Sequence, residues 1–214
     1  ASDGAPLWRV FTAHGSGGSA AVAGDVVYTQ TGCPPHVLRV RRDGTPLVPT
    51  SSACSSGRGG TPVVSGSRVL LFGDEVDSGV YDAATGARVG RLRSDYAPAV
   101  GHGLTLVTDA LIPGERVLRG HTLIARRAGG RVAWRFRGDG YLDSAPLIVG
   151  RRVFVGSGSG LVYALDVRTG RVRSRADAGT SVHAFTDHLP LPTGLAAGEG
   201  LLLVPARGRL VAFG

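Results

Sequence analysis

The sequence predicts an all-β fold, namely a single β-propeller of five blades, each a sheet of four antiparallel strands. Short apolar runs alternate with glycine-containing turns from one end of the chain to the other. Units of four such runs recur at intervals typical of propeller blades, about 40 to 50 residues. The 34 glycines and 12 prolines agree with many short strands joined by tight turns. We therefore expect one domain over residues 1–214.

The clearest copy of the repeated unit spans residues 144–179. Its first three apolar runs are Ala145–Val149, Arg152–Gly156 and Leu161–Asp166, and a fourth begins at Arg171. β-branched, aliphatic and aromatic residues dominate the first three runs, and glycines separate them, as is typical of strands joined by turns. Four strands in a segment of this length make one blade.

Two turns of this unit recur along the chain. The glycine expected between the first and second strands is found five times, at Gly24, Gly66, Gly101, Gly150 and Gly198. The turn between the third and fourth strands is found four times, at Gly44, Gly86, Gly130 and Gly170. We expect the blades at about 18–50, 61–94, 97–138, 144–177 and 192–214, the last of them without its fourth strand.

The N-terminal segment supplies that missing strand. Trp134 lies four residues after Gly130, and Trp8 lies four residues after Gly4. The last residues of the chain, 210–214, match a third strand, so we expect residues 4–11 to be the outer strand of the last blade. Pairing of the N- and C-terminal strands would close the ring and cover both sheet edges. The alternatives are a truncated ring and a six-bladed ring.

The motifs SAP at 144–146 and GLVYALDVRTG at 160–170 resemble the pyrroloquinoline-quinone-type (PQQ-like) propeller repeat. The resemblance is nearly complete in residues 144–170, good in residues 61–93 and partial elsewhere. The family includes quinoprotein alcohol dehydrogenases, the outer-membrane assembly lipoprotein and extracellular sensor regions of some bacterial Ser/Thr kinases. The resemblance implies the propeller fold, and many family members bind no quinone.

The sequence departs from the pattern of the quinone-dependent dehydrogenases. Those enzymes are similar to one another in having eight blades, a calcium ion held by Glu, Asn and Asp, and often a disulfide between adjacent cysteines. This chain has no asparagine, no adjacent cysteines and only three glutamates. We therefore predict no cofactor, and pyrroloquinoline quinone in particular is not expected.

The charge of the chain suggests no specific partner. The formal net charge is +8, and all 24 basic residues are arginines scattered through strands and turns. We interpret them as solvated strand faces and expect no specific binding of nucleic acid. The sequence has no apolar run long enough to span a membrane. We expect a monomer.

The chain contains no methionine and starts at Ala1. Such a start is typical of a mature end after signal cleavage, although other trimming explains it equally well. Together with the extracytoplasmic habit of the family it resembles, this predicts a secreted or periplasmic protein, or the extracellular part of a tethered bacterial protein.

Sorting residues by loop predicts two different faces. In a propeller, the loops between second and third strands and the connections between blades share one face, here called the loop face. Five of the six histidines fall in those loops. The other face, here called the hairpin-turn face, carries the remaining turns and is expected to hold turn residues and little else.

The loop face therefore carries the candidate site residues, because binding groups collect on loops held by a scaffold. The candidates for catalysis are His14, His121, His183, His188 and Asp143, and the same four histidines are the candidates for metal binding. No metal-binding spacing such as H-x-H or C-x-x-C supports a metal ion, so solvated or hydrogen-bonding histidines are the favoured interpretation. The candidates for ligand binding are Tyr96, Tyr141, Asp139, Arg119, His36 and Asp187.

Non-catalytic recognition by the loop face is the leading functional hypothesis. The partner would be a protein, a peptide, a glycan or a small molecule, and the chain would act as a sensor, binding or scaffold module. The alternative is a small-molecule enzyme that uses histidine as base or metal ligand on the same face. A purely structural module is the third hypothesis.

Two further local motifs have structural interpretations. Cys33 and Cys54 lie in loops of the same face, so we expect a disulfide between them, which suits an exported protein. Residues 156–160 read GSGSG and contain the G-x-S-x-G pattern, but no helix follows the serine, so we expect a flexible turn and no catalytic serine.

Overall fold

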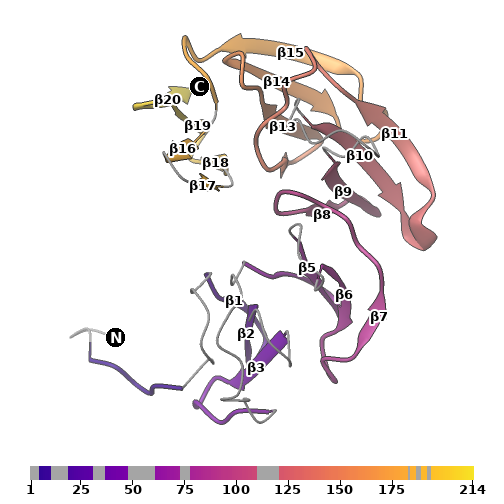
Figure 1. Ribbon diagram of the computed structural model, residues 1–214, viewed down its shortest axis with the longest axis vertical. Helices are drawn as coiled ribbons and strands as arrows, with labels where there is room; N and C mark the ends of the chain where they lie inside the picture. The colour runs from indigo at the N-terminus through magenta and orange to yellow at the C-terminus, as the bar shows by residue number, and fades with distance from the viewer. Residues whose placement is uncertain are drawn as a thin grey trace. The chain divides into compact units, whose positions relative to one another are not determined.

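The computed structural model describes residues 5–10, 19–30, 37–47, 61–72, 78–109, 121–182, 184–186, 189–191 and 194–214. Regular structure in these residues is β-sheet, apart from a 3₁₀ turn at Ala128–Gly130. None of their helical structure is long and apolar enough to cross a membrane. The chain divides into two compact units, residues 1–92 and residues 93–214, and Figure 1 labels most of the strands of both.

The first unit contains two antiparallel sheets whose strands follow in chain order. One sheet consists of β1 (Ala21–Ala23), β2 (Val26–Gln30) and β3 (Val37–Arg41). The other consists of β4 (Val63–Ser65), β5 (Arg68–Leu71), β6 (Gly79–Asp82) and β7 (Arg88–Gly90). A shared apolar cluster joins them, with Tyr28 and Val37 packed together with Val69, Leu71 and Tyr81.

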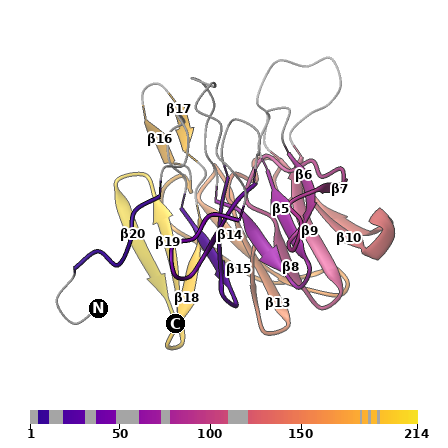
Figure 2. The ribbon, with the colours of Figure 1, turned by 90° about the horizontal axis from the view of Figure 1, so that it is seen from below.

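The second unit contains three larger sheets and one two-stranded ribbon. The first sheet is β8 (Ala99–Gly101), β9 (Leu104–Asp109), β10 (Thr122–Arg127) and β11 (Val132–Phe136). The second is β12 (Leu147–Val149), β13 (Arg152–Gly156), β14 (Leu161–Asp166) and β15 (Val172–Asp177). The third is β18 (Ala196–Gly198), β19 (Leu201–Ala206) and β20 (Arg209–Phe213). The ribbon of β16 (Ala184–Thr186) and β17 (Leu189–Leu191) lies beyond one end of the third sheet (Figure 2).

Apolar side chains join neighbouring sheets of the second unit. One cluster contains Leu106 of β9, Leu123 of β10, Val153 of β13 and Leu165 of β14. A second cluster joins β14 to β19 through side chains that include Val162 and Val204. Each of these side chains is almost fully buried, and burying one contributes about 1.5–3 kcal/mol. The sheets are therefore stacked against one another through continuous apolar contact.

The all-β, antiparallel organisation expected from the sequence is confirmed. Five of the sheets have three or four strands, and three of these five have the four strands of a complete blade. The sheets β1–β3 and β18–β20 have three strands each in the described residues. β20 is the third strand of its sheet and ends at Phe213.

The turn between the first two strands occurs in two forms, which the sequence alignment did not distinguish. In one form the first turn residue alone has a positive φ, at Gly24, Gly66 and Gly150. In the other form both turn residues do, at His102–Gly103 and Glu199–Gly200. Gly101 and Gly198 are thus the last residues of β8 and β18, and the prediction that they form the turn was wrong by one position. Both forms suit the right-handed twist of a two-residue hairpin.

Trp134 of β11 packs on the turn between β14 and β15 in the next sheet. Its indole Nε1 donates a hydrogen bond to the carbonyl oxygen of Val167 at 3.0 Å. Gly170 has a φ of +68°, and a Cβ there would lie 2.6 Å from the indole ring. Position 170 therefore requires glycine for two reasons, the positive φ of its backbone and the close approach of the indole ring.

Trp8 makes the same kind of contact in the first unit. Its Nε1 donates a hydrogen bond to the carbonyl oxygen of Arg42 at 2.9 Å. Gly44 follows in the same turn with a φ of +92°, and a Cβ there would lie 2.7 Å from the indole. The segment 5–10 thus meets the first sheet in the way that β11 meets the sheet after it.

Candidate functional site

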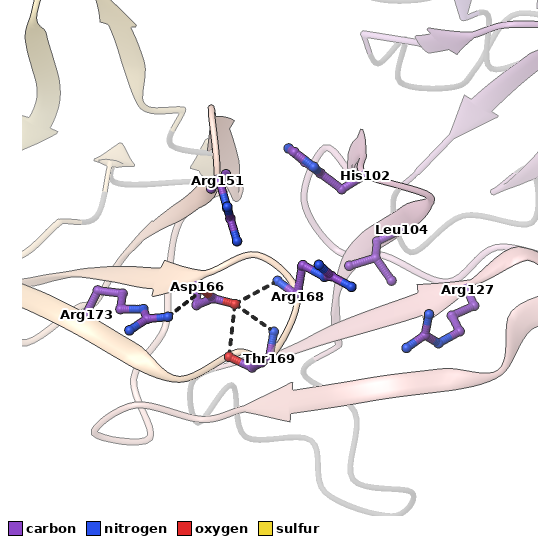
Figure 3. Close-up of a pocket in the computed structure, with 8 residues that line it drawn as sticks. All are labelled: His102, Leu104, Arg127, Arg151, Asp166, Arg168, Thr169 and Arg173. Atoms are coloured by element: carbon purple, nitrogen blue, oxygen red, sulfur yellow. Dashed lines mark hydrogen bonds and ion pairs between the residues drawn. The ribbon is translucent and has the colours of Figure 1, made fainter.

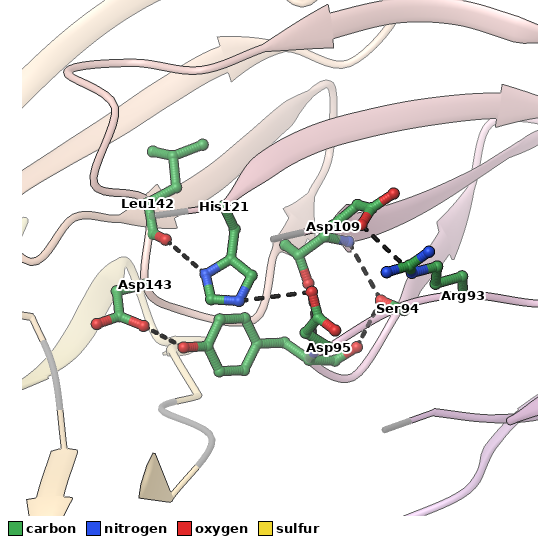
Figure 4. A network of polar contacts seen from close by, with 9 residues as sticks. Arg93, Ser94, Asp95, Asp109, His121, Leu142 and Asp143 are labelled. Carbon is green, nitrogen blue, oxygen red and sulfur yellow. Dashed lines mark hydrogen bonds and ion pairs between the residues drawn. The ribbon is translucent and has the colours of Figure 1, made fainter. Parts of the chain in front are cut away.

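Loop residues of the second unit form a compact polar cluster around Tyr96 and His121. Figure 4 labels His121 and its neighbours Asp95, Leu142 and Asp143. Tyr96 and Asp95 lie between β7 and β8, and His121 immediately precedes β10. Leu142 and Asp143 lie in the connection from β11 to β12. These five residues, here called the Tyr96–His121 cluster, come from the kinds of loop that the sequence assigned to the loop face.

His121 is held by its neighbours through both backbone and ring. Its amide donates to the carbonyl oxygen of Leu142 at 2.9 Å, and its Nδ1 lies 3.0 Å from the same oxygen. Since a carbonyl oxygen only accepts, Nδ1 carries a proton. The other ring nitrogen, Nε2, lies 3.6 Å from Oδ2 of Asp95, and this contact becomes an ion pair only when the imidazole is protonated. With 8% of its surface exposed, His121 is part of the interior.

Tyr96 is the second buried polar side chain of the cluster. Its hydroxyl donates a hydrogen bond to Asp143, and its ring centroid lies 4.6 Å from that of His121. Burial raises the pKa of the phenol far above its usual value, and the hydrogen bond to Asp143 raises it further. Tyr96 is therefore a neutral hydrogen-bond donor across the physiological pH range.

Hydroxyl groups fix the backbone beneath Tyr96. The Ser94 hydroxyl donates to the carbonyl oxygen of Tyr96 at 2.7 Å. The amide of Tyr96 donates to Oγ1 of Thr108 at 3.1 Å, and the amide of Thr108 donates to Oγ of Ser94 at 3.2 Å. Side chains on one loop and one strand thus replace the ladder hydrogen bonds that the chain lacks where it leaves the sheet.

The GSGSG turn between β13 and β14 is hydrogen-bonded to the connection from β11 to β12. The hydroxyls of Ser157 and Ser159 both donate to the carboxylate of Asp139. Burial raises the pKa of Asp139, but the hydrogen bonds from Ser159 and Ser157 outweigh it and hold that pKa below its usual value. The prediction of a flexible turn did not include these hydrogen bonds, because Asp139 lies 18 residues before Ser157 in the sequence.

Tyr141 lies in the connection that these contacts hold. Its amide donates to Oδ1 of Asp139 at 3.1 Å, and its carbonyl oxygen accepts from Oγ of Ser157 at 3.0 Å and from the amide of Gly158 at 2.7 Å. The residue is nevertheless 56% exposed. Tyr141 is therefore an exposed aromatic residue whose backbone amide and carbonyl oxygen are both hydrogen-bonded.

The structure brings together three of the candidate residues predicted from the sequence. Tyr96, His121 and Asp143 lie in one cluster, and Asp139 and Tyr141 lie in the same connection as Asp143. The remaining candidates lie outside the described residues: His14, His36, Arg119, His183, Asp187, His188, Cys33 and Cys54. The disulfide therefore stays a prediction, and the four histidines stay untested candidates for metal binding. In the part of the chain that is described, no three His, Cys, Asp or Glu side chains are grouped to hold a metal ion.

Sequence reasoning did not select Asp95, Ser157 or Ser159 as site residues. Asp95 adjoins Tyr96 in one loop, and that adjacency was the available signal. Ser157 and Ser159 were considered only as members of a serine-nucleophile pattern. Their hydroxyls contact a carboxylate from another connection, and the linear sequence contains no sign of that contact.

Repeated antiparallel sheets, joined by indole rings packed on glycine turns, define a protein built from PQQ-like propeller repeats. The chain belongs to the family described as outer membrane protein assembly factor BamB, whose model matches residues 74–214.

A curated relative is the polyvinylalcohol dehydrogenase of a Pseudomonas species, 39% identical over 67 residues. That match covers 31% of this chain and 10% of the enzyme, so the chain spans only a small part of its length.

Three solved structures are similar to the chain. Quinohemoprotein alcohol dehydrogenase from Comamonas testosteroni has a TM-score of 0.59 at 15% identity, covering 90% of this chain and 40% of that one. The computationally designed Ika8 protein has a TM-score of 0.56 at 14% identity, covering 94% and 70%. BamB from Moraxella catarrhalis has a TM-score of 0.48 at 16% identity, covering 90% and 67%. The first two likenesses concern the fold alone.

Proposed function

We propose that the chain is a non-catalytic binding or scaffold module of an exported protein, and that it recognises its partner through the loop face. The observation that carries the proposal is Tyr141, an exposed ring on a connection whose backbone is bound on both sides. A tyrosine supplies a large amphipathic contact area and loses little conformational entropy on binding. Fixing the loop before binding lowers the cost of association further.

The chemistry of the Tyr96–His121 cluster favours binding over catalysis. Tyr96 donates to a carboxylate and is kept neutral, so it is not a base. His121 is buried, and its Nδ1 is engaged by a main-chain carbonyl. A general acid or base has to reach a substrate proton. These side chains instead hold the loops that present Tyr141.

A protein or peptide is the partner class that we favour among the four considered. The family is described as an outer membrane protein assembly factor, which is a name for a protein that acts on other proteins. Such a role also supports the proposed location outside the cytoplasm, as a secreted, periplasmic or tethered protein. Glycans and small molecules are the other classes that the same exposed ring suits.

A random peptide library displayed on phage tests this function. Peptides selected on the immobilised chain should bind the Tyr141→Ala variant at least about tenfold more weakly, because an aromatic side chain at the centre of an interface is a typical hot spot. The matched control is Val172→Ala, since Val172 is also exposed but lies on the outer strand β15. Peptides that respond to Val172→Ala, or to neither substitution, would contradict recognition through the loop face.

The proposal includes the closed five-bladed ring as a single domain over residues 1–214. Its support is the match between Trp8 on Gly44 and Trp134 on Gly170, since the second contact joins the outer strand of one sheet to the next sheet. Segment 5–10 would then be the outer strand of the sheet β18–β20. Trp134 pairs with Ala125 across β11 and β10, so by the repeat Trp8 should face Ala212.

A small-molecule enzyme using the loop face is the second candidate. It is favoured by the similarity of 67 residues to a polyvinylalcohol dehydrogenase. Oxidation of polyvinylalcohol and of simple alcohols, with and without added pyrroloquinoline quinone, tests it directly. Turnover that disappears in a His121→Gln variant of unchanged stability would establish the enzyme and contradict a purely binding role.

The proposed disulfide and the less favoured metal site are tested separately from the binding function. Elemental analysis of protein prepared without an affinity tag checks the metal: stoichiometric zinc or copper would support a site at His14, His121, His183 and His188. Intact mass before and after reduction checks Cys33 and Cys54. Two free thiols would remove both the bridge and its support for export.

A further inference from the structure

A pocket of about 700 Å³ opens on the hairpin-turn face of the second unit, between the sheets β8–β11 and β12–β15. The basic side chains around it are His102, Arg127, Arg151, Arg168 and Arg173. Figure 3 shows them on four separate segments, the β8–β9 turn, the end of β10, the β12–β13 turn and the segment from β14 to β15. The expectation that this face holds turn residues and little else was therefore wrong.

The pocket carries more positive charge than its own acid neutralises. Asp166 is the carboxylate of the lining, and it already accepts from Arg173 at 2.8 Å and from the Thr169 hydroxyl at 3.0 Å. Those hydrogen bonds hold the pKa of Asp166 well below its usual value, so it stays ionised. Among the described residues, the guanidinium groups of Arg127, Arg151 and Arg168 make no hydrogen bond or ion pair.

The segments that carry two of these arginines are fixed by hydrogen bonds. Asp166 accepts from the amides of Arg168 and Thr169, both at 3.1 Å, which sets the β14–β15 turn. His102 reaches across to the β12–β13 turn, with its Nε2 2.7 Å from the carbonyl oxygen of Gly150, next to Arg151. The backbone beneath both guanidiniums is thus held before any ligand arrives.

The corresponding turn in the sheet β4–β7 shows which part of this arrangement belongs to the repeat. Asp82 accepts from the amides of Ala84 and Thr85 just as Asp166 accepts from those of Arg168 and Thr169. Ala84 stands where Arg168 stands, so that turn carries no guanidinium there. The aspartate turn is therefore a property of the fold, and the arginine is an addition to it.

We propose that this pocket binds an anion that carries two or more phosphate groups, either as a soluble oligophosphate or in a lipid headgroup. A guanidinium pairs with phosphate through two parallel hydrogen bonds. Three free guanidiniums on separate segments match several anionic groups better than one. The volume lies in the range of small-ligand pockets, about 300–1,000 Å³. This site is on the opposite face from Tyr141 and is independent of the proposed partner binding.

Calorimetry with inorganic tripolyphosphate is the first arm of the test. We expect saturable binding to the wild-type chain, weakening as salt is raised. Each of Arg127→Gln, Arg151→Gln and Arg168→Gln should weaken it by about tenfold, the usual effect of losing a charge-assisted hydrogen bond. Flotation with vesicles of phosphatidylcholine plus a bisphosphorylated inositol lipid is the second arm, and it shows whether a headgroup is accepted.

Arg135→Gln is the matched control, because Arg135 is exposed on β11 and lies outside the pocket lining. It removes the same charge and should leave binding unchanged, and melting curves should show all variants folded. An equal loss in Arg135→Gln would reduce the effect to net charge and overturn the proposal. Binding of neither tripolyphosphate nor the vesicles, or binding that survives the triple substitution, would also overturn it. Retention by vesicles alone would assign the site to a lipid headgroup.

Discussion

At the scale of single residues, the loop face depends on a few buried polar side chains. Tyr96 and His121 pack ring against ring, and each is hydrogen-bonded to the connection between β11 and β12. Asp139, which is exposed, accepts the hydrogen bonds from Ser157 and Ser159 that hold the turn between β13 and β14. Such contacts stabilise the protein only while each buried group keeps its partner.

Replacing Tyr96 by phenylalanine removes the hydroxyl that donates to Asp143. We expect the free energy of unfolding, measured by urea denaturation, to fall by about 1–3 kcal/mol, because the hydrogen bond is to a charged group and is partly buried. Tyr141→Phe is the control, since the Tyr141 residue is exposed, and it should change stability by less than about 0.5 kcal/mol. Equal losses in the two variants would show that the Tyr96 hydroxyl has no special role.

Asp139 predicts a dependence of stability on pH. Because its pKa is lower in the folded chain, its contribution is present above the unfolded pKa of about 3.9 and is lost as pH falls through the folded value. Asp139→Asn should therefore be less stable than the wild type at pH 7, and the gap should narrow below about pH 4. Urea midpoints at pH 7, 5 and 3 measure the gap.

The control for that series is Asp25→Asn, which removes an exposed carboxylate from the β1–β2 turn. If the Asp139 gap stays constant from pH 7 to pH 3, then the hydrogen bonds from Ser157 and Ser159 do not favour the ionised carboxylate.

At the scale of the elements, the stacking of one sheet on the next depends on a glycine beneath an indole. Gly170 and Gly130 both have positive φ, +68° and +83°, so an alanine is strained at either position. A Cβ at Gly170 would lie 2.6 Å from Trp134, whereas a Cβ at Gly130 meets no atom within 4 Å among the described residues. An alanine at either position strains the backbone, but only an alanine at Gly170 would also contact Trp134. Comparing the two variants therefore separates the cost of backbone strain from the cost of the steric contact.

Gly170→Ala should destabilise the chain more than Gly130→Ala does, by about 1–3 kcal/mol, the usual cost of overpacking. Urea denaturation of the two variants measures the difference, and tryptophan fluorescence should report a changed environment of Trp134 in the first variant only. Similar losses in both variants would mean that the ring shifts aside at little cost, and that the indole contact does not fix the stacking of the sheets.

At the scale of the whole molecule, the proposed closure of the ring predicts which residues of the first and last strands would pair. The repeat pairs Arg135 with Ile124 in the sheet β8–β11, and the corresponding positions in a closed ring are Arg9 and Val211. These two residues belong to different compact units, so they would pair only in the proposed closed ring.

Cysteines at positions 9 and 211, in a chain whose Cys33 and Cys54 are serine, should form a disulfide on mild oxidation. Directly opposed strand residues have the Cβ separation that a disulfide requires, about 4.5 Å before adjustment. Peptide mapping by mass spectrometry identifies the bridge. The control pair places the second cysteine at Val172, an exposed residue of β15. Failure of the first pair to cross-link, or equal linking of both, would contradict a ring closed by residues 4–11.

The sequence by itself determined the all-β class, the repeated unit and the glycines at Gly24, Gly66, Gly150 and Gly170, because turn chemistry and strand periodicity are local properties. The sequence placed the turns at Gly101 and Gly198 one residue too early. In these two turns both residues have a positive φ, and the first of them is His102 or Glu199, where the other repeats have glycine. Only the tertiary structure decided which polar residues meet. Tyr96, His121 and Asp143 converge because neighbouring sheets bring their loops together. Arg127, Arg151 and Arg168 surround one pocket for the same reason, although in the sequence they are scattered surface charges.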